Sequence, residues 1–310
     1  AAIQLSTTLL PLLALIAAAI WLASISPALA FPLALPIGGL LVRCFIIQHD
    51  CGHGSFVASR LANTAIGRLM SLLTLTPYAL WRRTHAMHHA GSGNLDRRGV
   101  GDIKTLTVDE YLALDRLGRL RYRIYRNPVF LFFVGVPAFF LVLQRLPWGH
   151  PVAPKDCWLS VLALDLAIIP VYGALAWAFG ATTLAAVVVP SLIVAAGIGG
   201  WLFFIQHQFE ETHWNTAADW AFQVAAVHGS SYYDLPPVLR WFTGNIGMHH
   251  IHHLNSMIPN YRLPDCLNSS PELKALNHLT LWESFKCARL KLWDEERRKM
   301  ITFNELPQAS

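Results

Sequence analysis

Four long apolar runs divide the chain, and polar segments rich in histidine and charge separate them. The runs cover residues 6–25, 29–48, 157–179 and 182–206, and each is about as long as the roughly 20 residues that a bilayer-spanning helix needs. Only a short turn joins the two members of each pair. The pattern therefore predicts an all-α integral membrane protein with four transmembrane helices in two hairpins.

Charged residues avoid these runs. Residues 1–42 contain no charged side chain, and residues 157–206 contain one, Asp165. The whole chain is 54% hydrophobic and 14% charged, with a formal net charge of +5. Because Lys and Arg stay on the cytoplasmic side of membrane proteins, the basic excess indicates cytoplasmic loops and gives no reason to expect a nucleic-acid partner. The five cysteines form no C-x-x-C pair, which fits a reduced cytoplasmic face.

Three histidine boxes follow or precede these runs. They are His49-Asp-Cys-Gly-His53, His85-Ala-Met-His-His89 and His249-His-Ile-His-His253. Positions i, i+3 and i+4 share one face of a helix, so each box is a candidate metal grip. His207 stands directly after the last apolar run and is the natural ninth ligand.

The number of histidines indicates more than one metal ion. Imidazole suits iron, zinc and copper, and eight or nine rings are too many for one ion but suit two. Unpaired imidazoles next to lipid are costly, whereas metal ligation satisfies them. Carboxylates or amides must orient the rings from behind. The candidates are Asp50, Asp96, Asp102, Glu210, Glu211 and Asn245.

One shared site requires all boxes to lie on one side of the membrane. The weaker apolar segments 62–80 and 129–146 are therefore predicted to be re-entrant or interfacial. The first contains Arg68, and the second is broken by Gly135 and Pro137 and has basic residues at both ends.

The polar segments complete a cytoplasmic helical cap. We predict an amphipathic helix from Val108 and surface helices over 271–300. Residues 1–310 are treated as a single domain. The chain begins with Ala rather than Met, so we expect that its native N-terminus is missing, and we expect no signal peptide.

The order H-x-x-x-H, H-x-x-H-H, H-x-x-H-H resembles the signature of the membrane fatty acid desaturases. Flanking residues resemble the bacterial acyl-lipid, delta-12 (omega-6) branch: His88-His-Ala-Gly-Ser-Gly-Asn-Leu-Asp-Arg-Arg98, Gln206-His-Gln-Phe-Glu210, and Phe242 to His253 with Ile258-Pro-Asn-Tyr261.

This resemblance implies a di-iron centre that uses O2 and two electrons to place a cis double bond in a fatty acyl chain. It implies the ligands His49, His53, His85, His88, His89, His249, His252 and His253, with His207 as the extra one. Ferredoxin or cytochrome b5 is the implied electron donor. The sequence contains no His-Pro-Gly-Gly haem motif, so we expect a separate donor protein, docked by basic residues of the cap. The implied location is a bacterial inner membrane with the site on its cytoplasmic face.

Other patterns are weaker. His213, His228 and His250 stand alone or break the spacing, and His207 has the alternative role of a hydrogen-bonded core histidine. Glu210-Glu-Thr-His213 lacks the second copy that a carboxylate di-iron bundle needs. Asp165 is expected to form a hydrogen bond that supports helix packing.

We expect a hydrophobic acyl tunnel whose upper wall is formed by residues next to the boxes. These are Phe45, Ile46, Ile47, Trp201, Leu202, Phe203, Phe204 and Ile205.

Two alternatives to desaturation stay open. A hydroxylase or ketolase acting on an alkane, carotenoid or acyl chain would share the same ligands. A non-catalytic membrane metal or haem protein is the second alternative, but the hairpins offer only Asp165 as a polar path.

Overall fold

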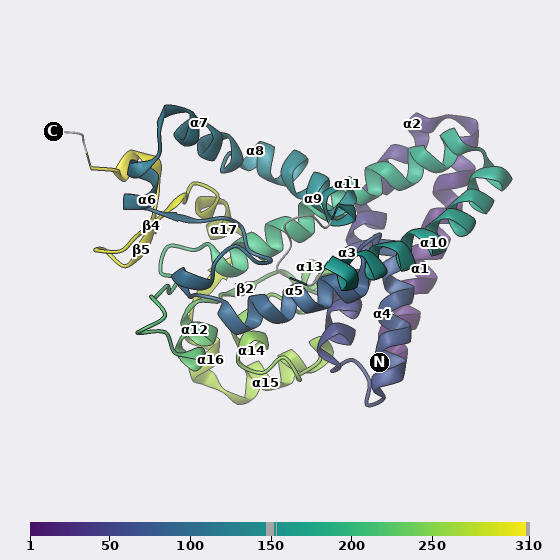
Figure 1. The fold of residues 1–310 in the computed structure, drawn as a ribbon. Coiled ribbons are helices and arrows are strands. Elements are labelled where there is room, and N and C mark those ends of the chain that lie inside the picture. The colour runs from purple at the N-terminus through teal and green to yellow at the C-terminus, as the bar shows by residue number, and fades with distance from the viewer. Residues whose placement is uncertain (147–151, 153, 308–310) are drawn as a thin grey trace.

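The structure is a computed structural model that describes residues 1–146, 152 and 154–307. Within that part of the chain, five helical stretches are long and apolar enough to cross a membrane. They are Ala2–Ile25, Pro27–His53, Pro128–Arg145, Lys155–Phe179 and Ala181–His207. The N-terminal helices and the hairpin of α10 and α11 occupy one side of the molecule in Figure 1, and the C-terminal segments occupy the other.

The first hairpin consists of α1 (Ala2–Ile25) and α3 (Ala34–His53). Two short pieces join them, α2 (Pro27–Ala30) and the 3₁₀ turn η1 (Phe31–Leu33). Proline opens α2 because its ring suits the first helical turn. α3 ends after His53 because Gly54 takes a left-handed conformation with φ 78°. Helix α3 thus continues through the whole first histidine box.

The second hairpin consists of α10 (Pro154–Phe179) and α11 (Ala181–His207), which turn at Gly180. α11 packs closely against α3, and a Cβ added at Gly38 would lie 2.6 Å from Val194 Cγ1. Both helices carry a boxed or predicted histidine as their last residue. The four predicted membrane helices are confirmed as helices. α1, α10 and α11 are longer than the hydropathy pattern gave, and α3 is shifted toward His53.

Helix α4 (Arg60–Thr74) is amphipathic and does not meet the length and hydropathy expected of a membrane span. Both of its ends lie beside the last turns of α3. Asn63 Nδ2 donates to Gly54 O at 3.2 Å, and Thr74 Oγ1 donates to Gln48 Oε1 at 2.7 Å. These contacts agree with the predicted interfacial helix. Helix α5 (Tyr78–Gly91) follows and carries the second box.

The stretch Pro128–Arg145 is long and apolar enough to span, although we predicted that it dips in and returns. It is irregular: α8 (Pro128–Phe130), a π-helical η3 (Leu131–Gly135), α9 (Val136–Leu141) and η4 (Leu143–Arg145). Just before it, Arg126 Nη2 donates to Gln208 Oε1 at 2.9 Å, and at its end Arg145 Nη2 donates to Leu75 O at 3.0 Å. Both partners lie near the histidine ends of α11 and α3. The contacts favour a return to one side, and the count of four spans stays a prediction.

Asp165 pairs with Arg145, the last residue of the irregular stretch. The pair joins α10 to the segment that ends at Arg145, so the carboxylate has a packing partner, as expected from the sequence.

The cap contains short elements, and a helix begins at Val108, as predicted. α6 (Val108–Ala113) ends at Leu114, whose backbone is extended, and α7 (Arg116–Tyr125) begins anew. The break occurs because Asp115 accepts from Gly118 N and caps the second helix. The remaining cap helices are η2 (Leu95–Arg97), α12 (Phe222–His228), α13 (Pro237–Phe242), α14 (His249–Leu254), η5 (Asn260–Arg262), α15 (Leu263–Ser269), α16 (Pro271–Ala275), α17 (Leu281–Cys287) and η6 (Phe303–Glu305).

The fold is mostly helical, as predicted, and two small sheets accompany the helices. β2 (Tyr232–Asp234) pairs in parallel with β3 (His278–Thr280). β1 (Leu106–Thr107) pairs in parallel with β4 (Leu292–Asp294), which pairs antiparallel with β5 (Lys299–Ile301). The tail predicted as surface helices thus ends in a hairpin. Leu292 and Ile301 are opposite each other in the register and fully buried, so tertiary packing selects the strands here.

Candidate metal centre

All nine predicted ligands converge in two neighbouring groups. The five-histidine group is His49, His53, His85, His89 and His252, and the four-histidine group is His88, His207, His249 and His253. Within each group, one nitrogen from every ring lies within 4.8 Å of all the others. His213, His228 and His250 belong to neither group among the described residues, as the spacing indicated.

The spacing of each box explains how its rings are divided. On α5, His85 and His89 are four residues apart and enter the five-histidine group, while His88 enters the other. Helix α14 does the reverse, because His249 and His253 share one group and His252 enters the other. Each H-x-x-H-H box therefore supplies two rings to one group and one ring to its neighbour. Two short helices hold the groups next to each other.

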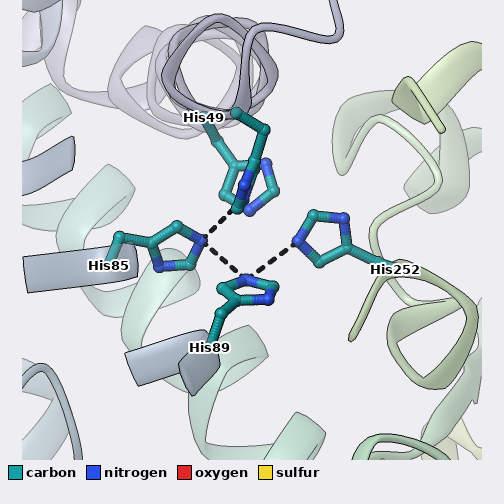
Figure 2. A group of neighbouring side chains, drawn as sticks. His49, His85, His89 and His252 are labelled. Atoms are coloured by element: carbon teal, nitrogen blue, oxygen red, sulfur yellow. Dashed lines mark hydrogen bonds between the residues drawn. The ribbon is translucent and has the colours of Figure 1, made fainter. Parts of the chain in front are cut away.

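Figure 2 shows rings of the five-histidine group approaching from different segments toward one centre. The Nε2 atoms of His85 and His53 are 3.1 Å apart, and those of His85 and His89 are 3.0 Å apart. The Nε2 atoms of His252 and His89 are 3.2 Å apart. A metal–nitrogen bond of about 2.1 Å places neighbouring ligands ~3.0 Å apart in octahedral geometry and ~3.4 Å apart in tetrahedral geometry. The spacing fits ligands of one ion.

The positions of the ring protons in the four-histidine group also indicate that its rings are ligands of one ion. His88 Nδ1 donates to Asp102 Oδ1 at 2.5 Å, and His207 Nδ1 donates to the Gly229 carbonyl at 3.2 Å. A neutral ring has one N–H, so the Nε2 atom of each ring carries a lone pair. Yet these two Nε2 atoms lie 3.2 Å apart, and His249 Nε2 lies 3.1 Å from that of His207. Lone pairs facing one another at this distance need a shared cation.

Burial favours the neutral form of five of these rings. It holds the pKa of His85, His89, His249, His252 and His253 well below the ordinary value, and the charge of neighbouring imidazoles lowers the pKa further. Neutral imidazole is the form that binds a metal. Among the described residues, the buried Nε2 atoms of His49 and His253 have no hydrogen-bond partner. The donor set and these orphaned nitrogens fit a pair of metal ions.

Asp50 and Asp102 lie behind the rings, as expected from the sequence. Asp50 Oδ1 accepts from His49 Nδ1 at 3.2 Å, which directs His49 Nε2 toward the group. Its other oxygen accepts from Asn260, from the backbone N at 2.7 Å and from Nδ2 at 2.8 Å. Asn245 Nδ2 donates to Asn260 O at 3.1 Å, so Asn245 acts only through Asn260. Sequence reasoning missed the role of Asn260, although it lies in the quoted flank 258–261.

Three of the suggested supporting residues are not placed behind the rings. Asp96 accepts from Ala217 N at 2.7 Å, and Glu210 pairs with Lys299 at 2.8 Å. Glu211 is exposed. Their position next to a box in the sequence is not matched in space, because the chain turns away after His89 and after His207. The sequence also missed the Gly229 carbonyl, since a backbone acceptor leaves no signal in a side-chain pattern.

Aromatic side chains border both groups. Trp81 stacks on His85 with ring centroids 4.7 Å apart, and Phe45 contacts Trp81 at 5.2 Å. Phe203 contacts His88 at 5.1 Å and His207 at 5.2 Å. Of the predicted wall residues, Phe45 and Phe203 lie here. The side chains of Ile46, Ile47, Leu202, Phe204 and Ile205 are buried in helix packing, and Trp201 packs on Phe132.

The model of the family described as "Fatty acid desaturase" matches residues 8–284. The chain belongs to the fatty acid desaturase family. A fatty acid desaturase of Bacillus subtilis is 38% identical over 304 residues, which cover 98% of this chain and 86% of the relative.

Two relatives from Synechocystis are more distant. The sn-1 oleoyl-lipid 12-desaturase is 26% identical over 243 residues, 73% of this chain and 64% of its own length. The sn-1 acyl-lipid omega-3 desaturase (ferredoxin) is 28% identical over 240 residues, 73% of this chain and 63% of its own length. The chain thus matches just under two thirds of the length of each of these two relatives. This desaturase is an oxidoreductase of lipid metabolism, with histidine clusters suited to metal and helices suited to a membrane.

Proposed function

We propose that this desaturase uses O2 and a pair of iron ions to introduce a cis double bond into a lipid-linked fatty acyl chain. The observation that carries the proposal is the pair of adjacent imidazole groups, each with lone pairs directed at one centre. His49, His53, His85, His89 and His252 would hold one ion, and His88, His207, His249 and His253 the other. When bound, the iron pair would supply the oxidising power to remove one hydrogen from each of two adjacent methylenes. The two electrons and two protons released from the acyl chain, together with two electrons from a donor protein and two further protons, would reduce O2 to two waters.

The protein's own residues orient the imidazole rings, and they bind and shield the acyl chain. Asp50 and Asp102 fix the two ring orientations for which the structure gives carboxylate partners. Phe45, Trp81 and Phe203 present apolar surface beside the imidazoles, where a saturated chain finds no polar partner but good packing. We propose that the acyl chain enters a tunnel along this wall. A flexible chain must be held in one conformation for a single methylene pair to react.

The names of the relatives support the class of substrate and of electron donor, and the charge of the cap supports where the donor docks. Relatives named acyl-lipid desaturases support a lipid-linked substrate, and two are named with ferredoxin. We therefore propose a separate ferredoxin or cytochrome b5-type donor that docks on the basic cap. The proposed location is a bacterial inner membrane with four spans and the histidine groups on the cytoplasmic face, because charged residues concentrate in that cap.

Expression in a bacterial host with saturated and monounsaturated lipids tests the reaction. Gas chromatography of fatty acid methyl esters should show a new double bond in the wild type and none in His207→Ala. His278→Ala is the matched control, because His278 is 39% exposed and lies outside both groups. New hydroxyl or keto groups would identify the rival oxygenation, and a Soret band with no product would identify a haem protein. Either result would refute the proposal.

A further inference from the structure

Helix α7 presents an apolar stripe that no described part of the chain covers. Leu117, Leu120 and Ile124 stand at i, i+3 and i+7 and so share one face of the helix. Their side chains are 51%, 53% and 47% exposed. Soluble proteins seldom leave such a row in water, so the stripe needs an occupant.

Arginines flank the stripe. Arg119 and Arg123 are held by the protein, since Arg119 Nε donates to Leu114 O at 3.0 Å and Arg123 Nε donates to Tyr111 Oη at 2.7 Å. Arg116 and Arg121 are exposed and have no hydrogen bond or ion pair within the described residues. At 100° per residue they lie on opposite sides of the stripe. The sole acid of residues 114–126, Asp115, is the N-cap of the helix.

The opposite face of α7 packs on the cap. Tyr122 is 5% exposed, and its hydroxyl donates to Lys291 O at 2.6 Å and accepts from Leu106 N at 3.1 Å. The stripe therefore points away from the cap. Arg126, the residue that ends α7, binds Gln208, the residue that follows α11. The C-terminal end of α7 thus lies beside the end of a candidate membrane helix. Figure 1 shows α7 and α8 forming one line that leads toward α9 and α11.

We propose that α7 lies flat on the leaflet next to the histidine groups and binds anionic phospholipid there. Leu117, Leu120 and Ile124 enter the acyl region, and Arg116 and Arg121 bind the negative headgroups. The stripe continues into Val129 and Phe133, each 68% exposed, at the start of an apolar stretch long enough to span. This continuity and the charge pattern identify the occupant as a lipid surface. The proposal depends on the membrane insertion of α11 and not on the reaction.

The contact reaches the metal centre through the segment after Asp102. Lys104 N donates to the hydroxyl of Tyr125, and Leu106 N donates to that of Tyr122, so α7 holds this segment at two points. Asp102 in turn orients His88. Anionic lipid under α7 therefore steadies the loop that positions a ring of the four-histidine group.

Hydrogen exchange of the full chain in bilayer nanodiscs tests the proposal. We compare discs of phosphatidylcholine with discs that contain 30% phosphatidylglycerol. Amides of residues 116–125 should exchange more slowly in the anionic discs, by about fivefold for each bound arginine. The difference should shrink in high salt. Equal exchange in the two discs would overturn the proposal.

Variants distinguish lipid binding by α7 from a general effect of the positive charge of the protein. Arg116→Gln/Arg121→Gln should abolish the difference between the discs, whereas Arg297→Gln/Arg298→Gln, with the same loss of charge on the β4–β5 turn, should retain it. Leu117→Asn/Leu120→Asn should speed exchange in both discs, because apolar insertion does not depend on lipid charge. A difference that persists in Arg116→Gln/Arg121→Gln would place the lipid elsewhere and refute the proposal. Acyl desaturation measured on the same samples reports separately on the proposed function.

Discussion

His88 Nδ1 and Asp102 Oδ1 lie 2.5 Å apart, and this contact fixes which nitrogen of His88 faces the four-histidine group. Asp102 comes from the loop after η2, whereas His88 comes from α5. The loop therefore sets the orientation of a ring on a neighbouring helix. Several consequences of such contacts can be measured.

Asp102→Asn should weaken the hold on His88. The amide keeps the size of the carboxylate but loses its charge, and a residue behind a metal ligand typically contributes a factor of about 10 to 100 in metal affinity or activity. We expect a loss of that size in desaturation rate, with bound iron falling toward one per chain. Asp96→Asn is the matched control, since Asp96 is exposed and its carboxylate accepts from the backbone of Ala217, away from the rings. Equal effects of both variants would contradict the role of Asp102.

Asn260→Ala should disturb the five-histidine group from a distance of 210 positions along the chain. The change removes the side-chain amide that donates to Asp50, and a buried polar group that loses a partner costs about 1–3 kcal/mol. A lower unfolding temperature and a reduced iron content should appear together. Asn268→Ala, at an exposed position on α15, should change neither. If the unfolding temperature of Asn260→Ala stays at the wild-type value, the bonds to Asp50 contribute nothing.

Phe203→Ala should lower turnover without removing metal. The ring contacts His88 and His207 but offers no ligand atom, so its loss leaves the imidazole groups complete while the substrate loses an apolar support. Misplacement of a substrate by about 1 Å costs on the order of a hundredfold in rate, and we expect a loss between tenfold and that value. Phe285→Ala, which truncates a half-exposed ring that packs on Trp201, is the control. Loss of iron in Phe203→Ala would mean that the ring supports the metal centre instead.

Gly38→Ala should separate α3 from α11. The added methyl would lie 2.6 Å from Val194, and overpacking of this kind typically costs about 1–3 kcal/mol. The unfolding temperature in detergent should fall, and Val194→Ala in the same chain should restore only part of it, because Val194 Cβ at 2.9 Å and the Ser191 carbonyl at 3.1 Å remain close. Gly173→Ala, where nothing lies within 4 Å, should have no such cost. A Gly38→Ala chain that unfolds at the wild-type temperature would contradict the close packing of the two helices.

The sequence predicted that the histidines converge, but it did not predict how they are divided between the two groups. The i, i+3, i+4 spacing predicted that the boxed histidines would gather, and all nine proposed ligands do. It did not predict that His88 and His252 each leave their box for the opposite group, because that depends on how α5 and α14 cross. Asp50 is adjacent to His49 and was expected, but Asn260 is remote in sequence and only the fold brings it near.

The fold was predictable wherever the length of an apolar run determines the secondary structure. Apolar runs predicted the helices of both hairpins, since in lipid a helix satisfies all the backbone polar groups of one continuous apolar segment. Three-residue strands such as β4 and β5 have too few positions for alternation to be visible, and pairing of Leu292 with Ile301 is a tertiary event. The end of α6 at Leu114 depended on a capping bond of Asp115 that competes with helix continuation.

The iron content of the purified chain, measured together with Mössbauer spectroscopy of 57Fe, tests the central claim most directly. The account predicts about two irons per chain in the wild type and about one in His207→Ala, with loss of the coupling between the two ions. A wild-type content of one iron, or of zinc in its place, would contradict a pair of irons held by two imidazole groups.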